Sequence, residues 1–204
     1  MGWIWGAVNA WSFRKELFYV ALAFVVVLSL PLVAVFILTH TGINVVSDSL
    51  IDVDKETRTI TILNPLDGSV AAEINQEMAW PVTGKVTLRF GESSLYQLFH
   101  TGIDIANPDG LIGDPIIPFM EGVVIYAGET ARGYGKHVII DHGNNISSVY
   151  AHLDRIYVYN GQKVKIGDVM GKMGSTGWST GPHLHFEIRV YGIPVNPEEV
   201  LGEI

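Results

Sequence analysis

An uncharged run near the amino terminus constrains the fold of this chain more than any other feature. From Leu17 to Leu38 the sequence contains no Asp, Glu, Lys or Arg, and most of its residues are aliphatic or Phe. At a rise of about 1.5 Å per residue, a helix of this length crosses the roughly 30 Å hydrocarbon core of a bilayer. We therefore expect a transmembrane helix at about residues 17–38, within an N-terminal segment formed by residues 1–40.

A secretory signal peptide is the alternative interpretation of this run. Such peptides have a shorter apolar region that ends at a cleavage site of small residues. Here the run ends in the larger residues Val-Phe-Ile-Leu-Thr-His at positions 35–40, which favours an uncleaved anchor. Pro31 removes one backbone hydrogen bond, but membrane helices tolerate proline where neighbouring groups compensate.

The charges that flank the run predict its orientation in the membrane. Arg14 and Lys15 lie just before it, whereas the next Lys or Arg is Lys55. Because basic residues concentrate on the cytoplasmic side of membrane helices, we expect the C-terminal part of the chain to lie outside the cytoplasm.

The net charge and the absence of cysteine exclude several classes of site. A net charge of −8, without a Lys/Arg cluster, gives no support for nucleic-acid binding, because the phosphate backbone favours a basic face. With no cysteine, the external part has no disulfide bonds, and any metal must be held by nitrogen and oxygen ligands. Histidine is therefore the residue type most relevant to a metal site.

The rest of the chain divides into a polar connecting segment and a β-rich domain. Residues 41–79 are mixed in character, with an alternating run at 57–63 that predicts an extracytoplasmic stalk carrying a small hairpin. Residues 80–204 should form one mainly β, antiparallel domain, because Val- and Ile-rich segments recur between turn residues without a helical apolar period. The predicted strands are Lys85–Phe90, Gly122–Ala127, His137–Asp141, Ser147–Leu153 and His183–Val190.

Five side chains in three short motifs indicate a metal site. They are His100, Asp104, His152, His183 and His185. Because side chains two apart in a strand point to the same face, His183 and His185 should stand side by side. His100 and Asp104, four residues apart, converge in the same way if their segment is extended. One face would then collect imidazoles and a carboxylate.

This donor set fits a catalytic zinc site, which uses three His and Asp/Glu ligands and leaves a fourth position for water. Histidines beside the metal could then carry protons. The alternative is that each histidine only satisfies a hydrogen bond in the core, which is the usual role of an isolated histidine. The grouping of five positions in three motifs favours the metal site, but spacing alone leaves open which three groups bind the ion.

Three motifs and their flanking residues carry a family resemblance. They read His-Thr-Gly-Ile-Asp-Ile-Ala at 100–106, Tyr-Ala-His-Leu at 150–153 and Gly-Pro-His-Leu-His-Phe-Glu at 181–187. In these residues, their order and their separation, the chain from about Trp80 to Pro197 resembles the LytM/lysostaphin-type metallopeptidases of peptidase family M23. A His-Leu-His pair alone would be a weak signal, whereas three ordered motifs are specific.

This resemblance implies a fold and an assignment of roles. The fold is a distorted antiparallel β sandwich of the duplicated hybrid motif type, with a long open groove. The family pattern implies a zinc ion (Zn2+) on His100, Asp104 and His185. It implies that His152 and His183 form the catalytic pair, which activates water and steadies the charge of the tetrahedral intermediate.

The resemblance also implies an activity, the hydrolysis of peptide bonds in bacterial cell-wall peptidoglycan. We expect a single-pass zinc endopeptidase of the bacterial cytoplasmic membrane, with its C-terminal domain extracytoplasmic. Some relatives have lost ligands and act as hydrolase activators or binding scaffolds, so a non-catalytic peptidoglycan-binding module is the alternative. A third hypothesis is an active enzyme within a secretion, conjugation or division machine. Its partner would be contacted through residues 1–40 and their Trp3, Trp5 and Trp11.

The other histidines receive no catalytic role in this interpretation. His142 is expected to serve a turn or strand end, His137 to lie at a surface or edge position, and His40 to mark the membrane boundary.

Two residues near the motifs have two open roles each. Glu187 either accepts a hydrogen bond from the ring of His185 or forms a structural salt bridge. Trp178 either lines a substrate groove or packs within its own loop.

Overall fold

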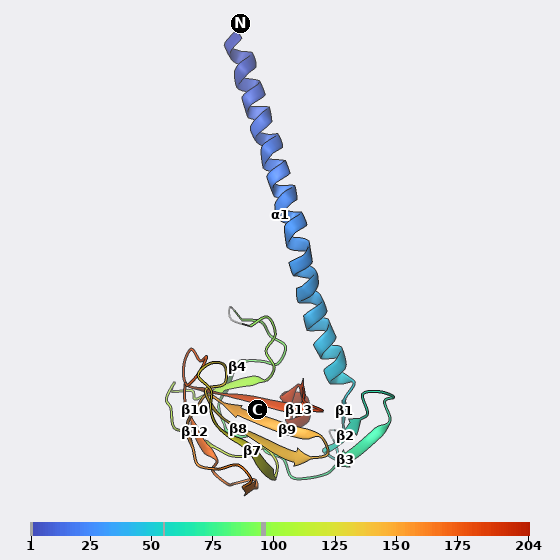
Figure 1. Ribbon diagram of the computed structural model, residues 1–204, viewed down its shortest axis with the longest axis vertical. Coiled ribbons are helices and arrows are strands. Elements are labelled where there is room, and N and C mark those ends of the chain that lie inside the picture. Colours follow the sequence, from blue (N-terminus) through green and yellow to red (C-terminus); the bar gives the residue numbers. More distant parts are fainter. Residues whose placement is uncertain (1, 55, 95–96) are drawn as a thin grey trace. The chain divides into compact units, whose positions relative to one another are not determined.

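The protein consists of a long amino-terminal helix and a β-rich unit. The computed structural model describes residues 2–54, 56–94 and 97–204, with side chains of the first helix at positions 15–31, 33–35, 37 and 41–48 (Figure 1). The chain divides into two compact units, Met1–Gly42 and Ile43–Ile204.

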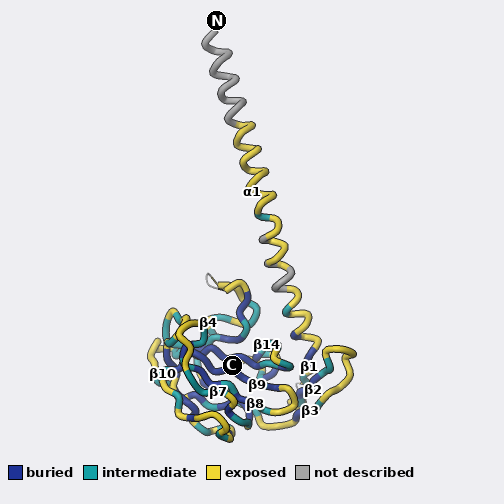
Figure 2. Tube along the Cα trace, in the orientation of Figure 1, coloured by how far each residue is buried: buried dark blue, intermediate teal, exposed yellow. Residues whose placement is uncertain are grey.

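Helix α1 extends from Gly2 to Asp48 and contains Pro31. Its segment Lys15–Val35 has a mean hydropathy of 2.7 and is, by length and composition, able to cross a membrane. The large apolar side chains that the structure describes between Leu17 and Ile37 are all exposed, as Figure 2 shows. A helix that is apolar on every side is typical of a membrane span, because such a surface is unfavourable in water. Trp3, Trp5 and Trp11 lie in α1, but their side chains are outside the described part.

Helix α1 continues to Asp48, past the expected end at Leu38. The last residues of α1 belong to the second unit, where Ser47 is buried and Leu50, two residues past the helix end, joins the hydrophobic core. Packing of this kind stabilises helical turns more than intrinsic propensity does. The end of the apolar run therefore did not indicate the end of the helix.

A three-stranded antiparallel sheet follows α1, with the order β1-β2-β3. Its strands are β1 (Ile51–Asp54), β2 (Thr59–Leu63) and β3 (Val70–Ile74). The predicted hairpin is thus part of a larger sheet. The buried side chains of this sheet share one core cluster with residues 80–204, and they are Ile51, Ile60, Ile62 and Ile74.

The main sheet has eight antiparallel strands in the order β11-β7-β8-β9-β13-β5-β4, with β14 also pairing with β13. The strands are β4 (Lys85–Leu88), β5 (Ile103–Ala106), β7 (Gly122–Glu129), β8 (Lys136–Gly143), β9 (Ile146–Ala151), β11 (Lys163–Val164), β13 (His183–Val190) and β14 (Ile193–Val195). The prediction of a mainly β, antiparallel domain is confirmed. The predicted strand Ser147–Leu153 is interrupted at His152, whose left-handed φ of 62° does not allow an extended strand to continue.

A second three-stranded sheet has the order β10-β12-β6 and comprises β6 (Pro115–Ile116), β10 (Leu153–Ile156) and β12 (Gly171–Met173). The short helix α2 (Pro197–Leu201) follows β14. The side chain of Asn196 caps this helix by accepting a hydrogen bond from the Glu198 backbone N–H.

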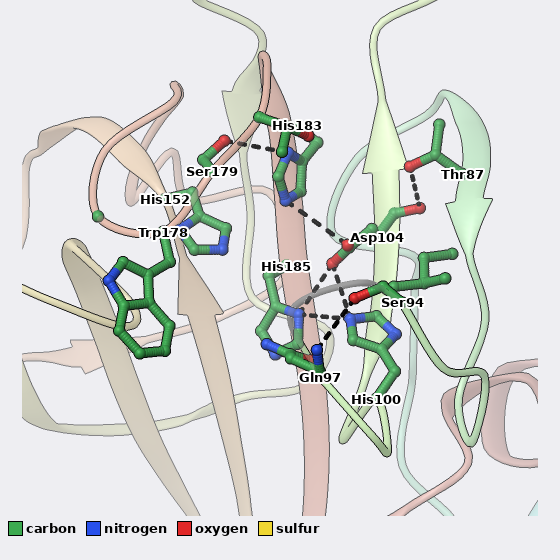
Figure 3. A pocket seen from close by; sticks show the side chains of 13 residues that line it. Thr87, Ser94, Gln97, His100, Asp104, His152, Trp178, Ser179, His183 and His185 are labelled. Atoms are coloured by element: carbon green, nitrogen blue, oxygen red, sulfur yellow. Dashed lines mark hydrogen bonds and ion pairs between the residues drawn. The ribbon is translucent and has the colours of Figure 1, made fainter. Parts of the chain in front are cut away.

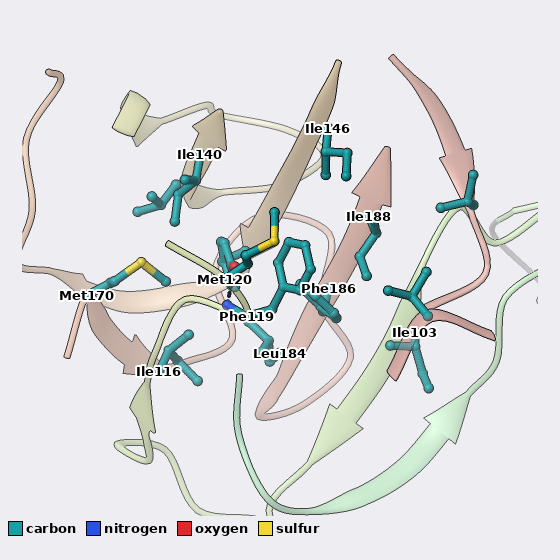
Figure 4. Close-up of a cluster of buried hydrophobic side chains, with 14 of the residues drawn as sticks. Ile103, Ile116, Phe119, Met120, Ile140, Ile146, Met170, Leu184, Phe186 and Ile188 are labelled. Atoms are coloured by element: carbon teal, nitrogen blue, oxygen red, sulfur yellow. Dashed lines mark hydrogen bonds between the residues drawn. The ribbon is translucent and has the colours of Figure 1, made fainter. Parts of the chain in front are cut away.

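Strand β13 has two different faces because successive side chains alternate across a strand. Leu184, Phe186 and Ile188 point into the hydrophobic core, where Phe186 packs 5.8 Å from the ring centre of Phe119 (Figure 4). The residues between them point to the opposite face of the sheet, where the histidines gather. The burial of one face of β13 therefore fixes which side chains the other face presents.

Candidate metal centre

The register of β5 and β13 brings two of the predicted ligands together. The two strands pair antiparallel with Asp104 directly opposite His185, so both side chains project from the same face. His100 lies before β5, outside any strand and between bends at residues 98–99 and 101–102. Gly102, between His100 and Asp104, allows a close approach to β13, since a Cβ at that position would overlap with the carbonyl oxygen of Phe186. His100 and Asp104 do converge, but through the bend that separates them and not through strand spacing.

Three side-chain atoms form a compact triangle in this site, as Figure 3 shows. His100 Nε2 lies 3.1 Å from Asp104 Oδ1 and 3.0 Å from His185 Nδ1, and His185 Nδ1 lies 2.8 Å from Asp104 Oδ1. Zinc binds nitrogen and oxygen ligands at about 2.0–2.2 Å, so one ion can reach all three atoms. The donor set of two imidazoles and one carboxylate thus fits zinc by both chemistry and spacing.

The opposite ring nitrogen of each of these histidines is also bonded. His100 donates its Nδ1–H to the carbonyl oxygen of Arg89 at 3.1 Å, and His185 Nε2 lies 2.9 Å from Glu187 Oε1. These bonds leave His100 Nε2 and His185 Nδ1 free to face the triangle. Outer acceptors of this kind fix the tautomer and the orientation of metal-binding imidazoles.

The charges around the triangle shift the pKa values of its members. Burial by itself raises the pKa of Asp104, but its contacts with the imidazoles of His100 and His185 hold this pKa well below its usual range. Burial by itself lowers the pKa of His185, whereas bonds to Asp104 and Glu187 raise it to about 9. The site therefore stabilises an ionised carboxylate beside a cation, and this environment also suits a metal ion.

His152 and His183 lie next to the triangle with their ring centres 4.8 Å apart. His183 Nε2 is 3.6 Å from Asp104 Oδ2, and the ring centre of His152 is 5.9 Å from that of His185. Burial and the neighbouring His183 and His185 lower the pKa of His152 to about 4. At neutral pH His152 is therefore uncharged and able to accept a proton.

Two neighbouring segments hold His152 in its left-handed conformation. Its backbone N–H donates to the carbonyl oxygen of Tyr134 at 2.9 Å, and its Nδ1–H donates to that of Thr176 at 2.8 Å. Thr176 Oγ1 also donates to the carbonyl of Leu153 and accepts from the N–H of Lys136, both at 2.9 Å. A non-glycine residue with positive φ costs free energy, and such residues often occur at functional sites.

All five predicted site residues line one pocket with a volume of about 830 Å³. The other described residues that line the pocket are uncharged. These lining residues are Thr87, Leu88, Ser94, Gln97, Gly177, Trp178, Ser179 and Thr180. Trp178 is 64% exposed and stands at one side of the pocket (Figure 3). An uncharged, open groove beside the triangle suits a peptide backbone better than a strongly charged ligand.

The two other histidines whose side chains the structure describes, His137 and His142, do not line this pocket. His142 donates Nδ1–H to the Glu121 carbonyl oxygen at 2.7 Å, in line with the structural role predicted for it. His137 is buried, not at the surface as expected, because β8 lies inside the main sheet and Tyr126 stacks on the ring at 4.5 Å. The side chain of His40 is outside the described part.

Sequence reasoning missed several groups that support the site. Arg189 could have been found, because it continues the alternation of His183 and His185 along β13. Thr101 lies within the motif at 100–106 but received no role, and Tyr134 gave no local signal. Both side chains contact Glu187, which is far from them in the sequence. Local periodicity does not predict such long-range contacts.

The sequence comparisons agree with the motifs. The pattern described as "Peptidase family M23" matches residues 98–197. Over 124 residues the chain is 47% identical to the murein hydrolase activator NlpD of Escherichia coli strain K12, covering 61% of this chain and 31% of NlpD. Over 101 residues it is 46% identical to the DD-carboxypeptidase/endopeptidase Mpg of Neisseria meningitidis serogroup B, covering 50% of this chain and 22% of Mpg. The chain thus spans less than half the length of these curated relatives.

A structural comparison gives the same relationship. The catalytic domain of the prophage-encoded M23 protein EnpA from Enterococcus faecalis, in a mutant form, superposes with a TM-score of 0.50 at 41% identity. The match covers 55% of this chain and 88% of that domain.

Proposed function

Because this chain belongs to peptidase family M23, we propose that it is a membrane-anchored zinc endopeptidase that hydrolyses peptide bonds of bacterial cell-wall peptidoglycan. The observation that carries this proposal is the complete set of five side chains around one open pocket. A scaffold that only binds the polymer has no need for a compact ligand triangle beside two further imidazoles.

In the proposed site, His100, Asp104 and His185 hold the zinc ion. When bound, the ion supplies Lewis acidity, which polarises the scissile carbonyl and makes a water molecule more acidic. The other steps belong to the chain's own side chains. They have to accept a proton from the attacking water, stabilise the oxyanion and return a proton to the departing amine.

Two hydrogen bonds support a role of His152 and His183 in this proton transfer. Each donates Nδ1–H to a backbone carbonyl, at Thr176 and Gly181 respectively, so each presents Nε2 to the pocket. One Nε2 accepts the proton of water as its oxygen attacks the carbonyl carbon. The resulting imidazolium then donates that proton to the amide nitrogen as the C–N bond breaks, which balances the hydrolysis.

The substrate and the location are supported by separate observations. Relatives with M23-type sequences carry names that refer to murein or to DD-peptidase activity. The apolar segment Lys15–Val35 and the basic pair before it favour an anchored enzyme whose C-terminal unit meets the cell wall. A soluble substrate would give no reason for such an anchor.

An activator of other hydrolases is the second candidate function, favoured by the relatives that are named murein hydrolase activators. In that case the pocket would bind a peptide strand or a partner protein without cleaving it. An envelope machine that recruits an active enzyme through residues 1–40 is compatible with either chemistry. The completeness of the site makes the enzyme the first choice.

The deciding experiment uses the purified full chain in detergent, loaded with zinc and incubated with peptidoglycan. We expect mass spectrometry to detect released fragments with new amino termini. A chelator should abolish the release, and His183→Ala should greatly reduce it. A folded, zinc-loaded chain that releases nothing, yet increases release by a second hydrolase, would support the activator instead.

A further inference from the structure

A buried carboxylate lies behind the metal triangle and takes no part in the proposed proton transfer. Glu187 is on β13 two residues after His185, and its side chain is fully buried. An ionised carboxylate in such a place is unfavourable unless several donors compensate for the lost water. The hydrogen-bond partners of Glu187 therefore indicate its role.

The two carboxylate oxygens of Glu187 have different partners. Oε1 accepts from Thr101 Oγ1 at 2.6 Å and from Tyr134 OH at 2.7 Å, and it lies 2.9 Å from His185 Nε2. Oε2 accepts from Arg189 Nε at 2.7 Å and lies 2.5 Å from Arg189 Nη2. Arg189 Nη2 also donates to Tyr134 OH at 2.8 Å, which closes a ring of three side chains.

This arrangement fixes which groups around Glu187 donate and which accept. The guanidinium of Arg189 can only donate, and because it already donates to Tyr134 OH, the tyrosine proton is directed to Glu187. Oε1 and Oε2 therefore face donors, and Glu187 must be an acceptor at both oxygens. His185 must then donate from Nε2, so Nδ1, which faces His100 and Asp104, is the nitrogen that it can offer to a metal ion.

We propose that Glu187 is the positioning residue of the zinc site, and that Arg189 and Tyr134 hold it so that His185 presents Nδ1 to the metal. This inference rests on the proposed zinc site and adds to it a reason for the orientation of one ligand. The other histidine ligand needs no such device. His100 is oriented by the backbone carbonyl of Arg89, which cannot change between donor and acceptor.

The substitution Glu187→Gln tests the proposal because an amide has a donor on one side. If its NH₂ group faces Arg189, donor opposes donor. If the NH₂ group faces His185 instead, Nε2 has to accept, and the proton moves to Nδ1, where it prevents metal binding. We expect the zinc dissociation constant of this variant to rise about 10- to 100-fold.

The double variant Glu187→Gln/Arg189→Met is the rescue. It removes the donors that oppose the amide, so the amide oxygen can face His185 while NH₂ lies beside an apolar side chain. We expect it to bind zinc at least about tenfold more tightly than Glu187→Gln alone, within the range that outer acceptors contribute. A purely structural role predicts the reverse, because two disrupted partners destabilise the domain more than one.

Zinc affinity is measured on the full chain in detergent by competition with a chromophoric chelator, and the melting temperature of each zinc-free variant is recorded in parallel. Ile140→Val removes one methyl group from the core and serves as the control for lost stability, with zinc affinity expected to stay as in the wild type. Unchanged affinity in Glu187→Gln, or a double variant weaker than Glu187→Gln, overturns the positioning role. Absence of zinc binding in the wild type overturns the zinc site itself and this inference with it.

Discussion

His152 and His183 lie with ring centres 4.8 Å apart, and each donates its Nδ1–H to a carbonyl oxygen of the loop between β12 and β13. The acceptors are Thr176 at 2.8 Å and Gly181 at 2.8 Å. Because a carbonyl can only accept, both rings have the same tautomer and expose Nε2. One loop therefore fixes the orientation of both imidazoles.

Replacement of either histidine by alanine should slow hydrolysis while zinc stays bound. We expect kcat/KM on peptidoglycan fragments to fall by about 10²–10⁴-fold in His183→Ala and in His152→Ala, the range for a lost general acid or base. Because the two residues serve one proton transfer, the double variant should lose little more than the worse single variant. Zinc content by elemental analysis is the control. Loss of zinc from His183→Ala would mean that His183 is a ligand.

The conformation of the same loop depends on Gly177, which has φ +70° and packs against another glycine turn. A Cβ at this position would overlap with Gly133 O and lie 2.7 Å from Gly135 Cα. We expect Gly177→Ala to displace the carbonyls that orient His152 and His183, lowering kcat/KM by about 100-fold, the cost of misplacing catalytic groups by about 1 Å.

Gly68→Ala is the matched control for this substitution. Gly68 also has φ +70°, but a Cβ there would meet nothing within 4 Å. It should cost about 1–2 kcal/mol of stability from the left-handed backbone alone and leave activity unchanged. Equal activities in the two variants would show that the loop does not position the histidines.

Local patterns predicted much of the site but only part of its supports. Glu187 was considered as an acceptor for His185, whereas Thr101 and Tyr134 were given no role. The two-residue spacing of His183 and His185 needed only the geometry of a strand, and the structure places both on one face of β13. The antiparallel, mainly β fold followed from short apolar segments between turns. These features depend on residues that are close together in the chain, so they can be predicted from a single sequence.

Other features depend on contacts between distant residues. The hydrogen bond from Thr101 to Glu187 spans 86 positions, and that from Tyr134 spans 53. The burial of His137 follows from the interior position of β8 in the sheet, and the extra turns of α1 from their packing. Strand order and register decide these contacts, and neither can be read from periodicity.

His142 should make the stability of the folded unit fall at acidic pH. Burial lowers its pKa from 6.5 to about 4, although the hydrogen bond to the Glu121 carbonyl opposes this shift. The unfolded chain therefore binds this proton more readily than the folded protein. The stabilisation is complete above pH 6.5, is lost as the pH falls toward 4, and amounts to at most about 3 kcal/mol.

Urea unfolding of residues 43–204, with a chelator present, measures this effect between pH 7.5 and 4. His142→Gln does not titrate, so the difference in unfolding free energy between wild type and variant should shrink with decreasing pH. The other acidic and basic groups titrate in both proteins and cancel. A difference that stays constant over this range would contradict the burial of a neutral His142.

The apolar segment of α1 is either an uncleaved anchor or a cleaved signal peptide, and fractionation of the protein distinguishes the two. An apolar helix of the length of Lys15–Val35 inserts nearly irreversibly, so the chain should stay in the membrane fraction at alkaline pH in carbonate. Its intact mass should include residues 1–40. A reporter enzyme that folds to an active form only outside the cytoplasm should be active when it is fused after Ile204. Replacing Val26 and Val27 by Arg should release the chain, because each centrally placed Arg costs about 2.5–3.5 kcal/mol. A mature chain that lacks residues 1–40 would instead assign them to a signal peptide, and recovery of the intact chain in the soluble fraction would argue against both.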